Sequence, residues 1–210
     1  MFRYPKMPGP TGAQLDKCVA FEKLDGTNLF WEWHREHGWT DFGTRSAGYT
    51  FSATGTADFR TRHPGLGEAP TLFDDLSEPL ARSLHSQTEI THAVAFTEFL
   101  GPNSFAGSHV PADPKRLVLF DVFIPDFGFF GPWRFLELFA GLPLPRVVYQ
   151  GKFSGKLTED VRAGKYPVAE GVVVKGGTGG ADVWMAKVKT DTYMERLKTA
   201  FGGRWEEFWE

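Results

Sequence analysis

Short runs of β-forming residues, each bounded by turn residues, constrain the fold of this 210-residue chain more than any other feature. Valine, threonine and aromatic residues fill these runs, and glycine, proline, aspartate or asparagine separates them. Runs of this length and spacing are typical of short strands joined in antiparallel sheets. We expect strands at residues 18–22, 29–33, 93–99, 117–123, 171–175 and 183–188.

Helical patterns are fewer. Residues 71–85 carry leucines at near-helical spacing, residues 132–140 open with a proline, and residues 190–208 are amphipathic. Strands interrupted by few helices predict an α+β fold with largely antiparallel sheets. Because no linker or repeat divides the chain, we expect one domain over residues 1–210, with a C-terminal helix within 190–210.

The composition excludes several classes of protein. With 41% apolar and 23% charged residues, the chain can bury a core of its own, and its 20 phenylalanines predict an aromatic-rich one. The chain has no apolar stretch of roughly 18 residues that could span a membrane. A single cysteine, Cys18, cannot form an internal disulfide or a multi-cysteine zinc site. These features favour a cytoplasmic protein.

The remaining local patterns predict no further site. A net charge of −3 allows a basic surface only locally. His34 and His37 are three residues apart and would not share a strand face, and the other histidines are scattered, so we expect no histidine metal site. The glycine-rich segment 176–180 lacks the Gly-Lys-Ser/Thr of a phosphate loop, which favours a hairpin turn.

One segment contains candidate functional residues: Phe21-Glu22-Lys23-Leu24-Asp25-Gly26-Thr27-Asn28. It places a lysine at the end of an apolar strand, before an Asp-Gly turn signal and a second strand. Lys-x-Asp-Gly occurs by chance in about 4% of chains of this length, and with the asparagine in roughly 0.2%. The segment therefore indicates a lysine held on a rigid strand edge.

This segment resembles motif I of the covalent nucleotidyltransferases, the superfamily of ATP-dependent DNA and RNA ligases and mRNA capping enzymes. Glu22 before it and Asn28 after it resemble the RNA ligase branch more than the DNA ligase branch. Segments similar to motifs Ia, III, IIIa, IV and V follow in the family's order, at residues 44–46, 96–99, 119–122, 170–175 and 187–189. The resemblance spans residues 21–189.

The residues themselves agree with this chemistry. Attack of an amine on the α-phosphorus of ATP needs a neutral lysine, although an ordinary lysine has a pKa of about 10.4. Lys187 and Lys189 are two residues apart, so they share one strand face while Ala186 and Val188 face apolar packing. Two cations there would neutralise phosphate charge and disfavour a third ammonium on Lys23.

The resemblance implies a role for each matching residue. Lys23 would be the nucleophile, and Lys187 and Lys189 would assist catalysis. Glu170 would contact a divalent metal or the substrate, and Asp25 would contact the metal through water or merely cap the turn. The implied nucleotide-binding residues are Glu22, Asn28, Arg45, Glu98, Phe120, Glu170, Lys187 and Lys189.

Two of these residues, Glu98 and Phe120, have alternative interpretations. We rank Lys175 below Lys187 and Lys189 as a site residue. Glu98 lies in a half-buried strand and needs a partner, either ribose hydroxyls or Arg45. Phe120 would stack on adenine or belong to the core. Strand alternation places Glu170 with Val172 and Val174, so we expect Lys175 on the opposite face.

The implied fold has antiparallel sheets flanking an ATP cleft, and the implied activity is 3′-hydroxyl to 5′-phosphate joining of RNA through lysyl-AMP. ATP and magnesium or manganese would be the cofactors, and nicked RNA or an RNA–DNA hybrid the substrate. Only 21 residues follow Lys189, too few for a C-terminal accessory domain, so an accessory protein would supply nucleic-acid affinity. The alternatives are a DNA ligase core, a capping-type guanylyltransferase and a non-catalytic adenylate-binding module.

Overall fold

The computed structural model describes residues 3–209, which divide into two compact units. The larger unit consists mainly of Asp25–Phe130 and Arg134–Leu144 together with Tyr4. The smaller unit consists of Pro5–Leu24, Gly131–Trp133 and the residues from Pro145 onwards. Each unit is built on its own antiparallel strands, as the α+β reading predicts.

The smaller unit contains a four-stranded sheet in the order β11-β9-β1-β8. Every neighbouring pair in it is antiparallel. Three of its strands confirm the expected runs, and β8 was not expected. The strands are β1 (Lys17–Lys23), β8 (Val147–Lys152), β9 (Gly171–Gly176) and β11 (Trp184–Lys189).

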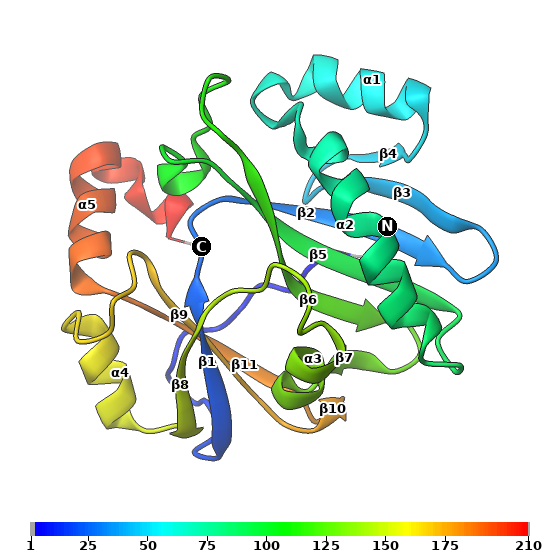
Figure 1. The fold of residues 1–210 in the computed structure, drawn as a ribbon. Helices are drawn as coiled ribbons and strands as arrows, with labels where there is room; N and C mark the ends of the chain where they lie inside the picture. Colours follow the sequence, from blue (N-terminus) through cyan, green and yellow to red (C-terminus); the bar gives the residue numbers. More distant parts are fainter. Residues whose placement is uncertain (1–2, 210) are drawn as a thin grey trace. The chain divides into compact units, whose positions relative to one another are not determined.

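Helix α4 (Gly155–Arg162) packs on one face of this sheet. Its first turn is capped by Ser154, whose Oγ accepts a hydrogen bond from the Leu157 N–H at 3.2 Å. Leu157 and Val161 are four residues apart and share a helix face. They join a buried cluster with Cys18, Ala20, Phe153, Val172, Val174 and Val188. The side chains that alternate with these strand residues therefore occupy the other face of the sheet. Helix α4 and the strands of this sheet are labelled in Figure 1.

The larger unit contains six antiparallel strands in the order β7-β6-β5-β2-β3-β4. The expected strands at 29–33, 93–99 and 117–123 are confirmed as β2, β5 and β6. The six strands are β2 (Thr27–His34), β3 (Gly38–Thr44), β4 (Gly48–Thr50), β5 (His92–Leu100), β6 (Arg116–Ile124) and β7 (Gly128–Phe130).

Aromatic side chains form much of the larger unit's core. Helix α2 (Ala69–His85) places Phe73 parallel to Trp31 of β2, with ring centroids 3.7 Å apart. Helix α1 (Ala53–Arg62) brings Phe59 within 5.0 Å of the Phe42 ring. All four rings are buried, as the phenylalanine-rich composition predicts.

The helix expected over 190–208 is two elements. Helix α5 (Asp191–Phe201) begins at Thr190, whose Oγ1 accepts from the Tyr193 N–H, and ends where Gly202 adopts φ +52°. The 3₁₀ helix η3 (Gly202–Phe208) follows. The other short elements are η1 (Pro64–Leu66), η2 (Phe105–Gly107), α3 (Pro132–Leu138) and β10 (Gly179–Gly180).

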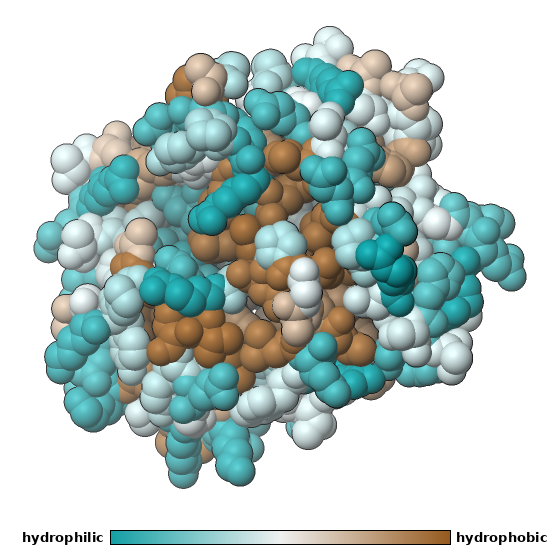
Figure 2. Space-filling model, in the orientation of Figure 1, coloured by the Kyte–Doolittle hydropathy of each residue, from teal (hydrophilic) through white to brown (hydrophobic). Residues whose placement is uncertain are grey.

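Some large apolar side chains remain on the surface. Figure 2 shows apolar residues, in brown, among hydrophilic ones on the face drawn there. The large apolar residues that the structure leaves exposed are Leu15, Val110, Phe127, Trp133 and Trp209. Within residues 3–209, every helix is too short or too polar to cross a bilayer.

Gly171, the first residue of β9, has no room for a side chain. Its φ of +153° is rare for L-residues, and a Cβ there would lie 2.0 Å from the Val188 carbonyl oxygen. We expect Gly171→Ala to lower the free energy of unfolding by about 2 kcal/mol or more. Urea denaturation checks this. Gly155→Ala is the control, because no heavy atom lies within 4 Å of its added Cβ; equal midpoints for the two variants would contradict the prediction.

Candidate active site

Four lysines lie on the face of the smaller unit's sheet that is opposite to α4. The antiparallel register sets them there, because residues paired across strands share a face. We call this the lysine face, defined by Lys23, Lys175, Lys187 and Lys189. Its three cross-strand rows are Lys23–Gly171–Lys189, Phe21–Val173–Lys187 and Val19–Lys175–Met185.

Lys175 lies opposite Val172 and Val174, as expected, but Glu170 does not share the face of these two valines. Lys175 shares a face with Lys187 and Lys189, and it is 3% exposed. Strand alternation from Glu170 fails because Glu170 precedes β9 and Gly171, with its positive φ, turns the backbone between them. The carboxylate of Glu170 therefore reaches the lysine face instead of the apolar cluster.

Glu170 is the acidic centre of the lysine face. Its Oε1 lies 2.9 Å from Lys23 Nζ and 2.9 Å from Lys189 Nζ, and its side chain is 3% exposed. Its main-chain oxygen accepts a hydrogen bond from the Thr190 N–H at 2.9 Å, which ties it to the start of α5. One carboxylate oxygen thus holds the predicted nucleophile and a second lysine together in a buried position.

The second oxygen of Glu170 fits a divalent metal ion. Oε2 is buried and has no hydrogen-bond partner among residues 3–209. A buried carboxylate oxygen without a partner is costly, and carboxylate oxygens are preferred ligands of magnesium and manganese. Glu170 is therefore suited to the metal contact that the sequence predicts, which stays a prediction.

The pKa of Lys189 reflects the electrostatic environment of the lysine face. Burial lowers the pKa of Lys189, and the neighbouring cations Lys23 and Lys187 add to the effect, while Glu170 acts in the opposite direction. This environment disfavours the ammonium form of Lys189.

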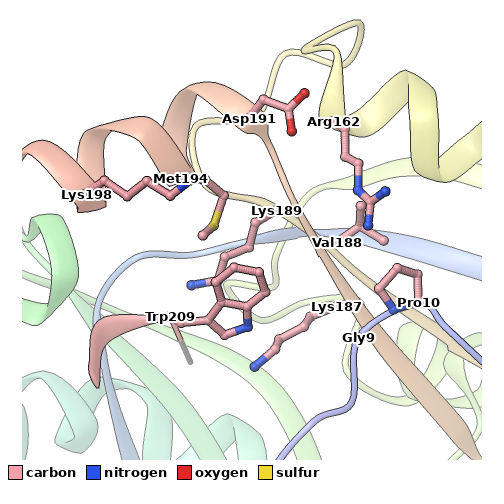
Figure 3. Close-up of a pocket in the computed structure, with 10 residues that line it drawn as sticks. All are labelled: Gly9, Pro10, Arg162, Lys187, Val188, Lys189, Asp191, Met194, Lys198 and Trp209. Carbon is pink, nitrogen blue, oxygen red and sulfur yellow. The ribbon is translucent and has the colours of Figure 1, made fainter. Parts of the chain in front are cut away.

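A pocket of about 280 Å³ adjoins the two lysines of β11. Lys187, Lys189, Arg162 and Lys198 contribute four cationic side chains to its lining, and Asp191 contributes one carboxylate (Figure 3). Gly9, Pro10, Val188, Met194 and Trp209 complete the lining. The excess of positive charge makes the pocket suitable for an anion such as a phosphate chain.

Glu22 lies on the other side of β1. It pairs across the sheet with Val172, whose side chain belongs to the apolar cluster, so it points away from Lys23. Its Oε2 lies 3.2 Å from Arg146 Nε. The predicted role of Glu22 in nucleotide binding stays a prediction.

The larger unit carries the remaining predicted nucleotide contacts. Asn28 of β2 and Glu98 of β5 are direct cross-strand neighbours, and Glu98 Oε1 accepts the Gly26 N–H at 3.0 Å. Arg45 is exposed and directly follows β3, whose last residue pairs with Leu29. These three residues therefore gather at one end of the larger unit's strands.

Phe120 is a partly buried member of an aromatic cluster. It lies at a register shift between β5 and β6 and packs against Phe30, Val94 and Phe96. The Tyr4 ring meets it edge-on, with centroids 5.1 Å apart. The structure thus gives Phe120 core contacts and leaves part of its ring exposed. Adenine stacking stays a prediction.

Asp25 and Thr27 fix the loop that follows β5. Both carboxylate oxygens of Asp25 lie 2.8 Å from the Ala106 N–H, and Ala106 has a positive φ of 51°. Thr27 Oγ1 lies 2.7 Å from His109 Nε2. Sequence analysis missed this contact because the two partners are 82 residues apart. Asp25 therefore anchors a loop, and its metal contact stays a prediction.

The lowered pKa of Lys189 predicts how stability changes with pH. Between this pKa and the ordinary value of 10.5, the unfolded chain holds a proton that the folded chain has released. The contribution of Lys189 to the free energy of unfolding therefore rises with pH through this window. From pH 8 to pH 10, we therefore expect the free energy of unfolding of the wild type to rise relative to that of Lys189→Met.

Urea denaturation at several pH values measures this difference. Lys198→Met, at an exposed position of α5, is the control and should keep the wild-type slope. A parallel pH dependence for wild type and Lys189→Met would contradict the assignment.

Comparisons with known proteins bear on the family and the fold of this chain. The RNA ligase family matches residues 16–189. A mutant of Naegleria gruberi RNA ligase with AMP and Mn is similar with a TM-score of 0.61 at 13% identity, over 93% of this chain and 58% of that chain. For form 2 of an archaeal ATP-dependent RNA ligase, the TM-score is 0.60 at 16% identity, over 98% of this chain and 53% of that chain.

This chain therefore spans little more than half the length of those proteins, and the similarity to them concerns the fold. A comparison with curated proteins found no match. The match to the family covers most of the chain, from the start of β1 to the end of β11. The chain belongs to the RNA ligase family.

Proposed function

We propose that this chain is an ATP-dependent RNA ligase-type nucleotidyltransferase in which Lys23 becomes covalently adenylylated. The observation that carries the proposal is the buried Glu170 carboxylate, which joins Lys23 to Lys189 on a face with two further lysines. In a chain that belongs to the RNA ligase family, this is the arrangement that lysine-dependent nucleotidyl transfer needs.

The proposed reaction has three steps. Lys23 Nζ attacks the α-phosphorus of ATP, loses its proton and forms a nitrogen–phosphorus bond as the bond to pyrophosphate breaks. A 5′-phosphate oxygen of the polynucleotide then attacks the same phosphorus, and Lys23 leaves as the amine. Finally, a 3′-hydroxyl attacks the activated 5′-phosphate, a phosphodiester forms and AMP leaves.

The cationic side chains of the smaller unit would stabilise the charge that moves in these steps. Lys187 and Lys189 are buried, and a buried cation interacts more strongly with phosphate than an exposed one. Arg162 and Lys198 line the same pocket and would extend this binding to further phosphate groups.

A bound magnesium or manganese ion would offset phosphate charge and polarise the reacting phosphoryl group. Glu170 would hold it through the buried Oε2. Asp25 is the second metal contact that the resemblance implies. Structures of Naegleria gruberi RNA ligase contain Mn together with AMP or ATP, which supports a metal-dependent reaction.

The nucleotide itself would contact residues of the larger unit. Arg45 and Glu98 would bind sugar and phosphate oxygens, and Asn28 lies beside Glu98 across the strands. Phe120 would offer the exposed part of its ring to adenine. Glu22 lies on the opposite face of β1 from Lys23. Its role in nucleotide binding would be indirect, by positioning the neighbouring Lys23.

RNA is the proposed substrate, as a nicked duplex or an RNA–DNA hybrid, and an accessory protein is a candidate source of nucleic-acid affinity. A DNA ligase core and a capping-type guanylyltransferase are the enzymatic alternatives. A module that binds adenylate without turnover is the non-catalytic one. The four lysines and Glu170 support the enzymatic readings, because reversible binding needs no nucleophile.

Intact mass spectrometry tests the nucleophile. We expect wild type incubated with ATP and magnesium to gain one adenylyl group and Lys23→Ala to gain none, because no amine then occupies the reacting position. Lys17→Ala is the matched control, since Lys17 lies on the same strand but is exposed, and it should react as the wild type does. Circular dichroism confirms that each variant is folded.

The same experiment controls for the choice of nucleotide and for AMP already attached to the purified protein. Protein is first treated with pyrophosphate to remove any AMP already attached, and GTP replaces ATP in a parallel reaction. An adduct with GTP alone would indicate a guanylyltransferase. No adduct with either nucleotide would favour the adenylate-binding module.

Transfer of AMP to nucleic acid tests the substrate class. We expect adenylylated protein to transfer AMP to the 5′-phosphate of nicked RNA roughly tenfold faster than to nicked DNA, because 2′-hydroxyl groups distinguish the two. Gel analysis of single-turnover reactions measures both rates. Faster transfer to DNA would favour the DNA ligase core.

A further inference from the structure

Two strands of the larger unit bring two histidines and a glutamate together far from Asn28 and Glu98. His34 ends β2 and His92 begins β5, and the antiparallel register pairs them directly. Glu32 lies two residues before His34 on the same strand, so all three side chains share one face of the sheet. The sequence did not predict this cluster, because His34 and His92 are 58 residues apart.

The side chains converge on one point. Glu32 Oε1 lies 2.9 Å from His92 Nε2 and 3.7 Å from His34 Nε2. The two imidazole rings are stacked, with centroids 4.1 Å apart and planes 15° from parallel. One ligand atom from each residue can be chosen so that all three lie within 4.8 Å of one another.

These distances are close to those of a metal site. Metal–nitrogen and metal–oxygen bonds of about 2.1 Å in a tetrahedral site place neighbouring ligand atoms roughly 3.4 Å apart. The two measured distances, 2.9 and 3.7 Å, fall on either side of that value. A closure of at most roughly 1.4 Å between the most distant pair would complete the geometry.

The charges also favour a shared cation. Each of the two imidazoles can donate a nitrogen lone pair to one metal ion. The carboxylate of Glu32 would balance part of the ion's charge. The side chains are 20% to 35% exposed, which leaves an entry path and room for water ligands.

We propose that Glu32, His34 and His92 form a binding site for a divalent transition metal ion of the zinc type. Two imidazoles and one carboxylate suit zinc, nickel or cobalt better than magnesium, which prefers oxygen ligands. The site lies six residues along β2 from Asn28, roughly 20 Å away, so it is separate from the nucleotide contacts predicted there. The ion would connect the end of β2 to the start of β5.

Isothermal titration calorimetry with zinc chloride tests the proposal. The protein carries no histidine tag, and it is treated with a chelator and transferred to chelator-free buffer. We expect one zinc ion to bind per chain. The His34→Gln/His92→Gln double variant should bind zinc at least about tenfold more weakly. His63→Gln is the matched control, because His63 is a half-buried histidine of the same unit outside the cluster, and it should bind as the wild type does.

Cobalt gives a second measurement. Visible absorption of the cobalt-loaded wild type should show the bands of a site with nitrogen and oxygen ligands, and the double variant should lack them. Glu32→Gln keeps both histidines and should also weaken zinc binding at least about tenfold, which tests the site if the double variant does not fold. Absence of stoichiometric zinc binding would leave Glu32 and His92 as a hydrogen-bonded pair alone and overturn the proposal. Unchanged binding in the variants would overturn it equally.

Discussion

The carboxylate of Glu170 is the interaction on which the lysine face depends. Its buried Oε1 lies 2.9 Å from Lys23 Nζ and 2.9 Å from Lys189 Nζ, and a negative charge at this position offsets repulsion between the two neighbouring lysines. Removal of one member of a buried ion pair costs roughly 3–5 kcal/mol, because the remaining charges lose their partner. The same carboxylate has a second, unpartnered oxygen, so the group that assembles the face is also suited to hold a metal ion.

The antiparallel register of three strands brings the residues of the lysine face together. Strand β9 lies between β1 and β11, so residues from three distant segments form rows across one sheet, and α4 covers the opposite face. Gly171 has a decisive part in this arrangement, because its positive φ turns the Glu170 carboxylate toward the lysines. A single glycine thus determines which face of the sheet receives the acidic group.

Much of the fold could be predicted because its strongest signals are local. The β-rich runs and the leucine spacing of α2 are contained within short windows, and the structure confirms them. Helix α4 was missed because it presents only Leu157 and Val161 as an apolar pattern over its eight residues. The pairing of Lys187 with Lys189 followed from alternation along one strand. The placement of the Glu170 carboxylate and the meeting of His34 with His92 could not be predicted, because they depend on a backbone turn and on register between distant strands.

The most direct test of the central claim is to locate the adenylyl group among the four lysines of the lysine face. Protein adenylylated with ATP is digested under alkaline conditions, which preserve a phosphoramidate bond, and the peptides are sequenced by tandem mass spectrometry. The account predicts AMP on Lys23 alone, in a peptide that trypsin has failed to cut at that residue. AMP on Lys175, Lys187 or Lys189, or distributed among several lysines, would contradict the assignment of Lys23 as the nucleophile and of the others as groups that stabilise charge.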